Sequence, residues 1–179
     1  MPTKTESFET MLTGGHPNSL GRTVEVVEVV LKDASRLSEL YNCYFSDDEV
    51  VRLRTSNALK RICAEYPEWL VPYIDKLLSE VSNINQASAQ WTLAQLFNSL
   101  TSYINVSQKQ KGIKILKRNL EHNDDWIVQN QTMQTLADWA KTDEALKEWL
   151  EPHLDNLVND ERKSIAGRAK KLRKALYKH

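Results

Sequence analysis

The feature that most constrains the fold is a segment that the chain contains twice. EWLVPYIDKLL begins at Glu68 and EWLEPHLDNLV begins at Glu148, so Glu-Trp-Leu, Pro, Asp and Leu return at the same offsets in the second copy. A second set of segments recurs at nearly equal intervals, and these read SDDEVVRLRTSNALKRI, INQASAQWTLAQLFNSL, NDDWIVQNQTMQTLADW and RKSIAGRAKKLRKAL. Repeats at a fixed period indicate a chain built from copies of one structural unit.

The spacing of apolar residues predicts helices over most of the chain. Apolar residues recur every three to four positions, and only 5 Gly and 5 Pro interrupt 179 residues. TVEVVEVV (residues 23–30) is the one ambiguous run, because β-branched residues favour strands, but no second strand is predicted to pair with it. We therefore predict an all-α fold of nine helices, at roughly 20–32, 34–45, 47–65, 67–82, 86–102, 106–122, 125–141, 143–159 and 162–177.

The interval between the recurring segments, with two helices per unit, is typical of α-solenoids, in which each unit stacks on its neighbours. The repeats resemble the HEAT family: a first helix with Pro and Leu-Leu, a short Asp-rich turn, and a second helix that opens with Val-Arg and continues to Ala-Leu. The resemblance covers about 34–179. It implies a HEAT-like α-solenoid of about four helix pairs, with a flexible arm over 1–17 and a single domain over 18–179.

The prolines of the duplicated segment, Pro72 and Pro152, lie one turn into the first helix of their units. Each removes one backbone hydrogen bond and is expected to kink the helix. Trp69 and Trp149 precede them and are expected to pack against the neighbouring unit. We interpret the duplicated segment as a packing element rather than as a pair of binding sites.

The second helix of each unit carries the candidate binding residues. At 100° per residue, some positions lie opposite the apolar stripe, and the HEAT resemblance implies that they line a concave groove. The candidate groove residues are Leu53, Asn57, Trp91, Gln95, Asn130 and Gln134. Trp91 and Leu53 are the expected apolar anchors, because Trp is enriched at binding hot spots, and the amides are expected to form hydrogen bonds. An alternative is that the N-terminal helices cover Trp91.

Charge is uneven along a chain whose formal net charge is zero. Residues 161–179 carry eight basic side chains and one acidic one, and the candidate basic patch there is Arg168, Lys171 and Lys174. With a second basic run over 109–118, this patch favours nucleic acid as the alternative partner. HEAT-like alkylpurine DNA glycosylases hold DNA in a basic groove, but here the acidic remainder of the chain and the lack of a central aspartate count against that function.

The stretch GGHPNSLGRT (residues 14–23) has dense turn chemistry before a helix. Five residues separate its second and third glycines, and Arg replaces the Lys of a phosphate-binding loop, so nucleotide binding is not expected. The Pro-Asn pair predicts a turn, and Asn18 or Ser19 is expected to cap the following helix. The candidate loop site consists of His16, Asn18 and Arg22.

The remaining observations narrow the class of function. The four histidines lack metal-ligand spacing, so no metal or cofactor is expected. Cys43 and Cys63 are expected to be buried in a reducing cytosol. No apolar run reaches the roughly 18 residues of a membrane span, which favours a cytoplasmic protein without membrane contact. A small-molecule ligand is not indicated, and a weaker likeness to HEAT-like phycobilin lyases requires a pigment pocket. The leading hypothesis is a non-enzymatic adaptor that binds a protein or peptide.

Overall fold

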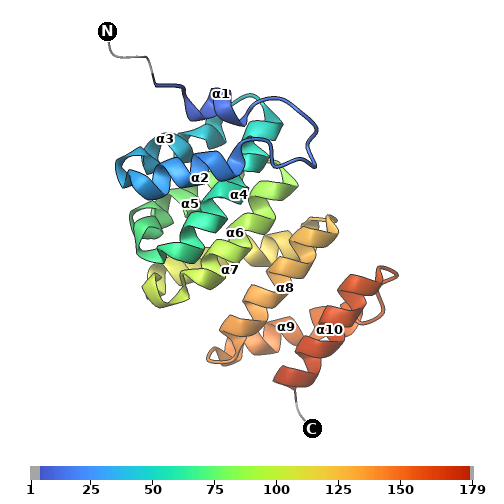
Figure 1. The fold of residues 1–179 in the computed structure, drawn as a ribbon. Helices are drawn as coiled ribbons and strands as arrows, with labels where there is room; N and C mark the ends of the chain where they lie inside the picture. Colours follow the sequence, from blue (N-terminus) through green and yellow to red (C-terminus); the bar gives the residue numbers. More distant parts are fainter. Residues whose placement is uncertain (1–4, 178–179) are drawn as a thin grey trace. The chain divides into compact units, whose positions relative to one another are not determined.

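A computed structural model describes residues 5–177 of the chain, and the α-helices in this range confirm the all-α prediction (Figure 1). No strand occurs among these residues. The contacts gather in two compact units, Met1–Thr92 and Leu93–His179. The HEAT-like solenoid and the single domain over 18–179 stay predictions.

In residues 5–92 the first unit contains five complete α-helices, four 3-10 helices and the start of α6. The α-helices are α1 (Phe8–Leu12), α2 (Thr23–Lys32), α3 (Leu37–Asn42), α4 (Glu49–Glu65), α5 (Ile74–Ser79) and α6 (Ala87–Ser99), which continues into the second unit. The 3-10 helices are Ala34–Arg36, Cys43–Phe45, Pro67–Tyr73 and Val81–Asn83.

Helix α4 is the centre of the first unit, because α1, α2 and α3 all pack against it. Its predicted apolar stripe is buried as expected, and consists of Val51, Thr55, Ala58, Leu59 and Ile62. The Asp48 side chain accepts a hydrogen bond from the backbone N–H of Val50 at 2.8 Å and so caps the helix, as its position before the stripe predicts.

Residues 5–17 are not the flexible arm that the sequence suggested. Phe8, Met11 and Leu12 of α1 are buried. The Glu39 carboxylate accepts a hydrogen bond from the Phe8 N–H at 3.0 Å, and the Arg36 guanidinium lies 4.0 Å from the centre of the Phe8 ring. A helix this short cannot show a helical period, which explains the error. Residues 1–4 of the predicted arm lie outside the described residues.

Arg54 of α4 organises the loop that connects α1 to α2. Its side chain is 2% exposed, and its guanidinium donates to four backbone carbonyl groups of this loop and its edges. Nη1 donates to the carbonyl oxygens of Leu12 (2.8 Å) and Gly14 (2.5 Å). Nη2 donates to His16 and Nε to Ser19, each at 3.3 Å. The buried positive charge therefore holds the loop by its backbone.

Glycines allow this loop to close around the guanidinium. Gly14, Gly15 and Gly21 have φ values of +83°, +79° and +51°, a region that side chains disfavour. A Cβ atom at Gly21 would lie 2.8 Å from Cζ of Arg54, so this position also lacks space for a side chain. The glycine spacing of the loop thus has a structural cause.

We expect Arg54→Met to lower the free energy of unfolding by about 3 kcal/mol, because it removes the donor of the buried Leu12 carbonyl and of three further carbonyl groups in partly buried contacts. Amide hydrogen exchange at residues 13–22 should accelerate more than exchange in α4. Arg61→Met is the matched control, since Arg61 is exposed on the same helix, and it should change stability by no more than about 0.5 kcal/mol. Equal effects of the two substitutions would show that Arg54 does not hold the loop in place.

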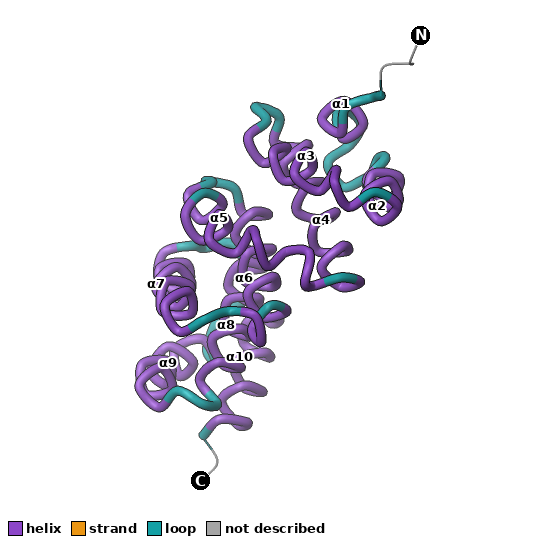
Figure 2. Tube along the Cα trace, turned by 90° about the vertical axis from the view of Figure 1, so that its left-hand side faces the viewer, coloured by secondary structure: helices purple, strands orange, loops and turns teal. Residues whose placement is uncertain are grey.

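The second unit contains the end of α6 and four further α-helices. These are α7 (Val106–His122), α8 (Trp126–Ala140), α9 (Glu144–Leu157) and α10 (Lys163–Leu176), with one 3-10 helix at Thr101–Tyr103. Helix α8 packs against α7, α9 and α10, and α9 packs against α10. Both views show α8 and α10 side by side (Figures 1 and 2).

Side chains cap the helices of this unit. Asn105 and Gln108 form a reciprocal capping box at the start of α7. The Asp125 carboxylate accepts from the N–H groups of Ile127 and Val128 at 2.9 and 3.0 Å. Asp125 therefore caps α8 as Asp48 caps α4.

The duplicated segment packs through its leucines. Leu70 and Leu150 are buried at equivalent positions, and so are Ile74 and Leu154 one turn later. One copy lies in each unit. The interpretation of this segment as a packing element is therefore consistent with the burial of both copies.

The first proline of the duplicated segment differs from expectation, and both tryptophans are only partly covered. Trp69 and Trp149 are half-buried. Trp69 stacks on Tyr66 at 4.4 Å between ring centres. Pro72 lies within the 3-10 helix Pro67–Tyr73, so no α-helix is kinked there, whereas Pro152 lies inside α9. The same residue type is thus accommodated in two ways.

We expect Leu150→Ala to reduce the free energy of unfolding by about 2–5 kcal/mol, the range for a fully buried leucine. Trp149→Ala should cost only about 1–2 kcal/mol, because part of the indole stays in contact with water. Denaturant unfolding of the two variants measures the difference. A Trp149→Ala loss as large as that of Leu150→Ala would show that the indole is the main packing group.

Candidate functional site

The six candidate groove residues divide between the two units. Leu53, Asn57 and Trp91 are half-buried residues of the first unit, and the Asn57 side-chain carbonyl accepts a hydrogen bond from Arg61 Nε at 2.6 Å. Gln95, Asn130 and Gln134 belong to the second unit. A single groove through all six residues therefore stays a prediction, and Trp91 is less exposed than its helical position suggested.

Asn130 is buried, which corrects its predicted place on an open surface. It is 5% exposed, because α10 packs against that side of α8. Its Nδ2 donates to the Ser164 hydroxyl at 3.3 Å, but its Oδ1 is buried and has no hydrogen-bond partner. An unpaired buried acceptor of this kind costs about 1–3 kcal/mol, so Asn130 has an unused hydrogen-bonding capacity.

A chain of hydrogen bonds connects the three helices α6, α8 and α10. Arg168 Nη1 donates to Gln134 Oε1 at 3.2 Å, and Gln134 Nε2 donates to Asp138 Oδ2 at 3.1 Å. The same carboxylate accepts from Asn98 Nδ2 at 2.8 Å and from Lys141 Nζ at 3.0 Å. Arg168, from the predicted basic patch, is thereby held beside Gln134 from the predicted groove.

Asp138 is a central acid that the sequence analysis missed. Burial raises its pKa, but hydrogen bonds from Asn98, Lys141 and Gln134 outweigh burial and hold the pKa of this carboxyl below its ordinary value. It is therefore a charged acceptor at neutral pH. Its position one turn after Gln134 places both on one helix face, and this was the signal available in the sequence.

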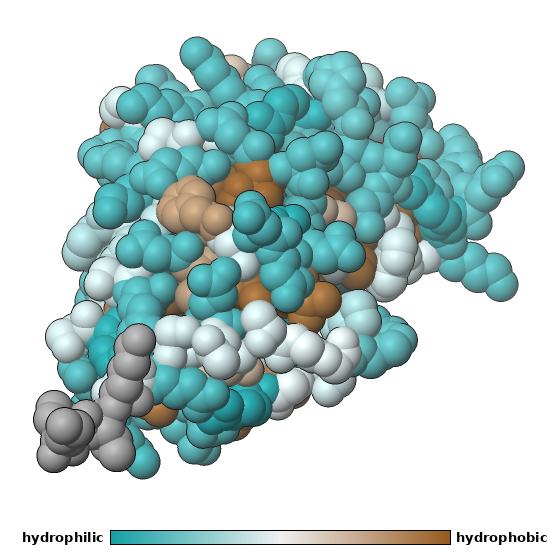
Figure 3. Space-filling view, turned by 90° about the horizontal axis from the view of Figure 1, so that it is seen from above, coloured by the Kyte–Doolittle hydropathy of each residue, from teal (hydrophilic) through white to brown (hydrophobic). Residues whose placement is uncertain are grey.

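Trp126 is the most exposed large aromatic side chain of the second unit among the described residues. It is 51% exposed at the start of α8, one turn before Asn130 and therefore on the same side of the helix. The other exposed large hydrophobic residues are Leu20, Val24, Phe45, Tyr66, Tyr103 and Val106. Figure 3 shows hydrophobic side chains reaching one face between hydrophilic ones.

Gly167 completes a candidate surface on α10. No atom lies within 4 Å of the position that a Cβ atom would occupy there. Gly167 follows Ser164 by one turn and precedes Arg168, and both of these neighbours bind α8. We name this surface the α8–α10 face; it consists of Trp126, Asn130 and Gln134 from α8 and Ser164, Gly167 and Arg168 from α10.

Ion pairs neutralise part of the positive charge in and directly before α10. Arg162 pairs with Asp160 at 2.9 Å, and Arg173 pairs with Asp155. Lys171 and Lys174 are exposed, whereas Arg168 is half-buried. The predicted basic patch therefore consists of two exposed lysines beside an arginine that is committed to Gln134.

The candidate loop site is one exposed loop with internal pairing. His16 Nδ1 accepts a hydrogen bond from the Asn18 N–H at 3.1 Å. Arg22 binds Glu6 at 2.7 Å and Glu25 at 2.8 Å, and its hydrogen bonds lower the pKa of both carboxyls. The guanidinium is thus occupied by two acids.

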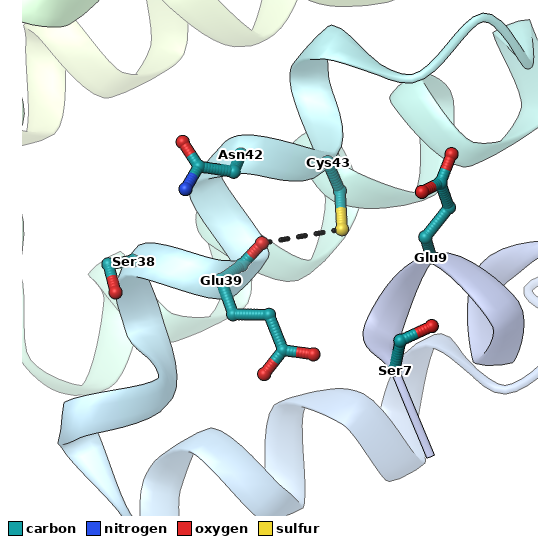
Figure 4. A pocket seen from close by; sticks show the side chains of 6 residues that line it. All are labelled: Ser7, Glu9, Ser38, Glu39, Asn42 and Cys43. Atoms are coloured by element: carbon teal, nitrogen blue, oxygen red, sulfur yellow. Dashed lines mark hydrogen bonds between the residues drawn. The ribbon is translucent and has the colours of Figure 1, made fainter.

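A polar hollow lies between α1 and α3 (Figure 4). It has a volume of about 380 Å³ and is lined by Ser7, Glu9, Ser38, Glu39, Asn42 and Cys43. Burial, with the nearby charges of Glu9 and Glu39, raises the pKa of the Cys43 thiol to about 12. Its Sγ donates to the Glu39 carbonyl at 3.4 Å. A protonated thiol is a poor nucleophile, so this hollow lacks an activated cysteine.

The described residues contain neither a metal-binding cluster nor a helix suited to crossing a membrane. In the part of the chain that the structure describes, no group of three or more His, Cys, Asp or Glu side chains is placed to hold a metal ion. None of the helices found in residues 5–177 combines the length and apolar character that crossing a membrane requires.

Comparison with known proteins finds no matching family model, no matching curated protein and no matching solved structure. The HEAT resemblance stays a prediction.

We expect Gly167→Ala to raise the free energy of unfolding by about 0.5–1 kcal/mol, because Ala favours the helix and its methyl group meets no atom. Gly112→Ala in α7 is the matched control, since its Cβ would lie 3.2 Å from the Trp139 ring. The control should gain less or lose stability in thermal unfolding. Destabilisation by Gly167→Ala would show that the space is not open.

Proposed function

We propose that this chain is a non-enzymatic binding protein that holds an extended peptide segment of a partner protein on the α8–α10 face. The observation that carries the proposal is the exposed indole of Trp126 at the start of α8, on the side of that helix where Gln134 is joined to Arg168 of α10. The HEAT resemblance is compatible with a binding role, but the proposal does not depend on it.

The hydrogen-bonding groups suit a peptide backbone. An extended peptide offers N–H and C=O groups that are not used within a helix or a sheet, and the hydroxyl of the exposed Ser164, which accepts from Asn130, can donate to such a carbonyl group. Gly167 leaves space beside Ser164 for close approach of a backbone.

The side chains around this position suit an anchored, oriented peptide. Trp126 offers a large apolar surface at one end of the face, and aromatic residues of this kind supply most binding energy at protein interfaces. Arg168 keeps donors beyond the one that binds Gln134. A partner segment with an apolar residue followed by an acidic residue fits this order.

The test uses peptides selected from a random library displayed on phage and panned on the full chain. Affinity is then measured by fluorescence polarisation. Trp126→Ala should weaken binding by about 30-fold, the equivalent of about 2 kcal/mol. Gly167→Phe should weaken it at least about 10-fold by occupying the space for the backbone, although it leaves the fold intact in thermal unfolding.

Two exposed positions provide the controls. Tyr103→Ala removes another exposed aromatic residue of the second unit, and Lys170→Phe adds the same bulk elsewhere on α10. Both should leave peptide affinity within twofold. Selection of no peptide, or of peptides that bind Trp126→Ala and Gly167→Phe as tightly as the original chain, would refute the proposal.

A further inference from the structure

Helix α7 presents lysines on the side that faces away from its core. Its buried positions include Gly112, Leu116 and Leu120, which pack inward. At 100° per residue, Ser107, Lys111 and Lys114 lie on the opposite side. Together with Gln110, Ile113 and Lys117 they line a hollow of about 410 Å³, and we name these six residues the lysine face.

The charge of the lysine face is not compensated within its helix. The first acid of α7 is Glu121, and it lies within 3.5 Å of His153 and 3.6 Å of His122. Lys111 and Lys114 are exposed, and neither takes part in an ion pair with another described residue. A row of unpaired positive charges along a hollow attracts a polyanion.

Aromatic side chains lie at both ends of this row. Lys117 Nζ lies 4.6 Å from the centre of the Trp149 ring, and Trp149 stacks on His153 at 3.9 Å. At the other end Tyr103 is 42% exposed, just before the Asn105 cap of α7. The capping box fixes the first turn of the helix between Tyr103 and the lysines.

We propose that the lysine face binds single-stranded nucleic acid. Lys111, Lys114 and Lys117 contact successive phosphates, and Tyr103 stacks on an unpaired base at the end of the row. Basic grooves with flanking aromatic rings suit single strands, because every exposed base has a π face. A duplex buries those faces, and an acidic peptide offers a ring only where it contains an aromatic residue, so the aromatic residues favour a single strand over both.

This inference goes beyond the proposed peptide site, because it uses a different helix and a different ligand. Lys111→Gln with Lys114→Gln changes no residue of the α8–α10 face. Failure of one proposal therefore leaves the other to be judged by its own measurement.

The experiment measures the binding of fluorescently labelled 15-nucleotide oligo-dT and RNA to the full chain by anisotropy, between 20 and 200 mM NaCl. Each neutralised phosphate of a single strand contributes about −0.7 to the slope of log K against log salt concentration, so three lysines predict a slope near about −2. The Lys111→Gln, Lys114→Gln variant should bind at least about 10-fold more weakly at 50 mM NaCl, with a slope closer to zero by about 1.4.

Two further variants separate charge from stacking. Lys171→Gln with Lys174→Gln removes the same charge from α10 and should change affinity less than twofold. Tyr103→Ala should weaken binding without changing the salt slope. Absence of binding, an equal loss in the α10 variant, equally tight binding of a 15-base-pair duplex, or displacement by poly-glutamate at equal charge would each overturn the proposal.

Discussion

The fold depends on covering one apolar stripe per long helix with the neighbouring helices of the same unit. Helix α4 shows this in the first unit, where α1, α2 and α3 cover its buried side, and α8 shows it in the second, between α7, α9 and α10. Directed polar contacts set the alignment: Thr135 Oγ1 donates to the Ala94 carbonyl at 2.8 Å, and Trp139 Nε1 donates to the Thr101 hydroxyl at 2.9 Å.

The parts of the fold that could be predicted from the sequence are those set by local spacing. The stripe of α4 follows from residue order within a few turns, and an Asp directly before a helix, such as Asp48 or Asp125, is a cap that the same local order indicates. Helix α1 could not be found this way, because Phe8, Met11 and Leu12 span barely one turn. Its burial depends on partners that are distant in the sequence, such as Arg36.

The candidate site was harder to predict, because neighbours decide which positions of a helix are open. Helical geometry placed Asn130 away from its own stripe, but α10 covers that side and buries it. Helical geometry did not single out Trp126, although the Trp126 side chain is far more exposed to solvent than that of Asn130. Arg54 would be expected at a surface, and only the loop that precedes α2, far earlier in the chain, explains its burial.

The way in which arginines attach that loop has a consequence for its stability at acidic pH. Carbonyl oxygens do not titrate, and arginine stays charged at all physiological pH values, so the inner attachment through Arg54 does not change as pH falls. The outer attachment behaves differently, since Arg22 holds Glu6 and Glu25 as carboxylates with lowered pKa values. Its contribution is present above the ordinary glutamate pKa and disappears as pH falls through the lowered values. At acidic pH the loop therefore loses the ion pairs of Arg22 with Glu6 and Glu25, whereas it keeps the hydrogen bonds that Arg54 donates.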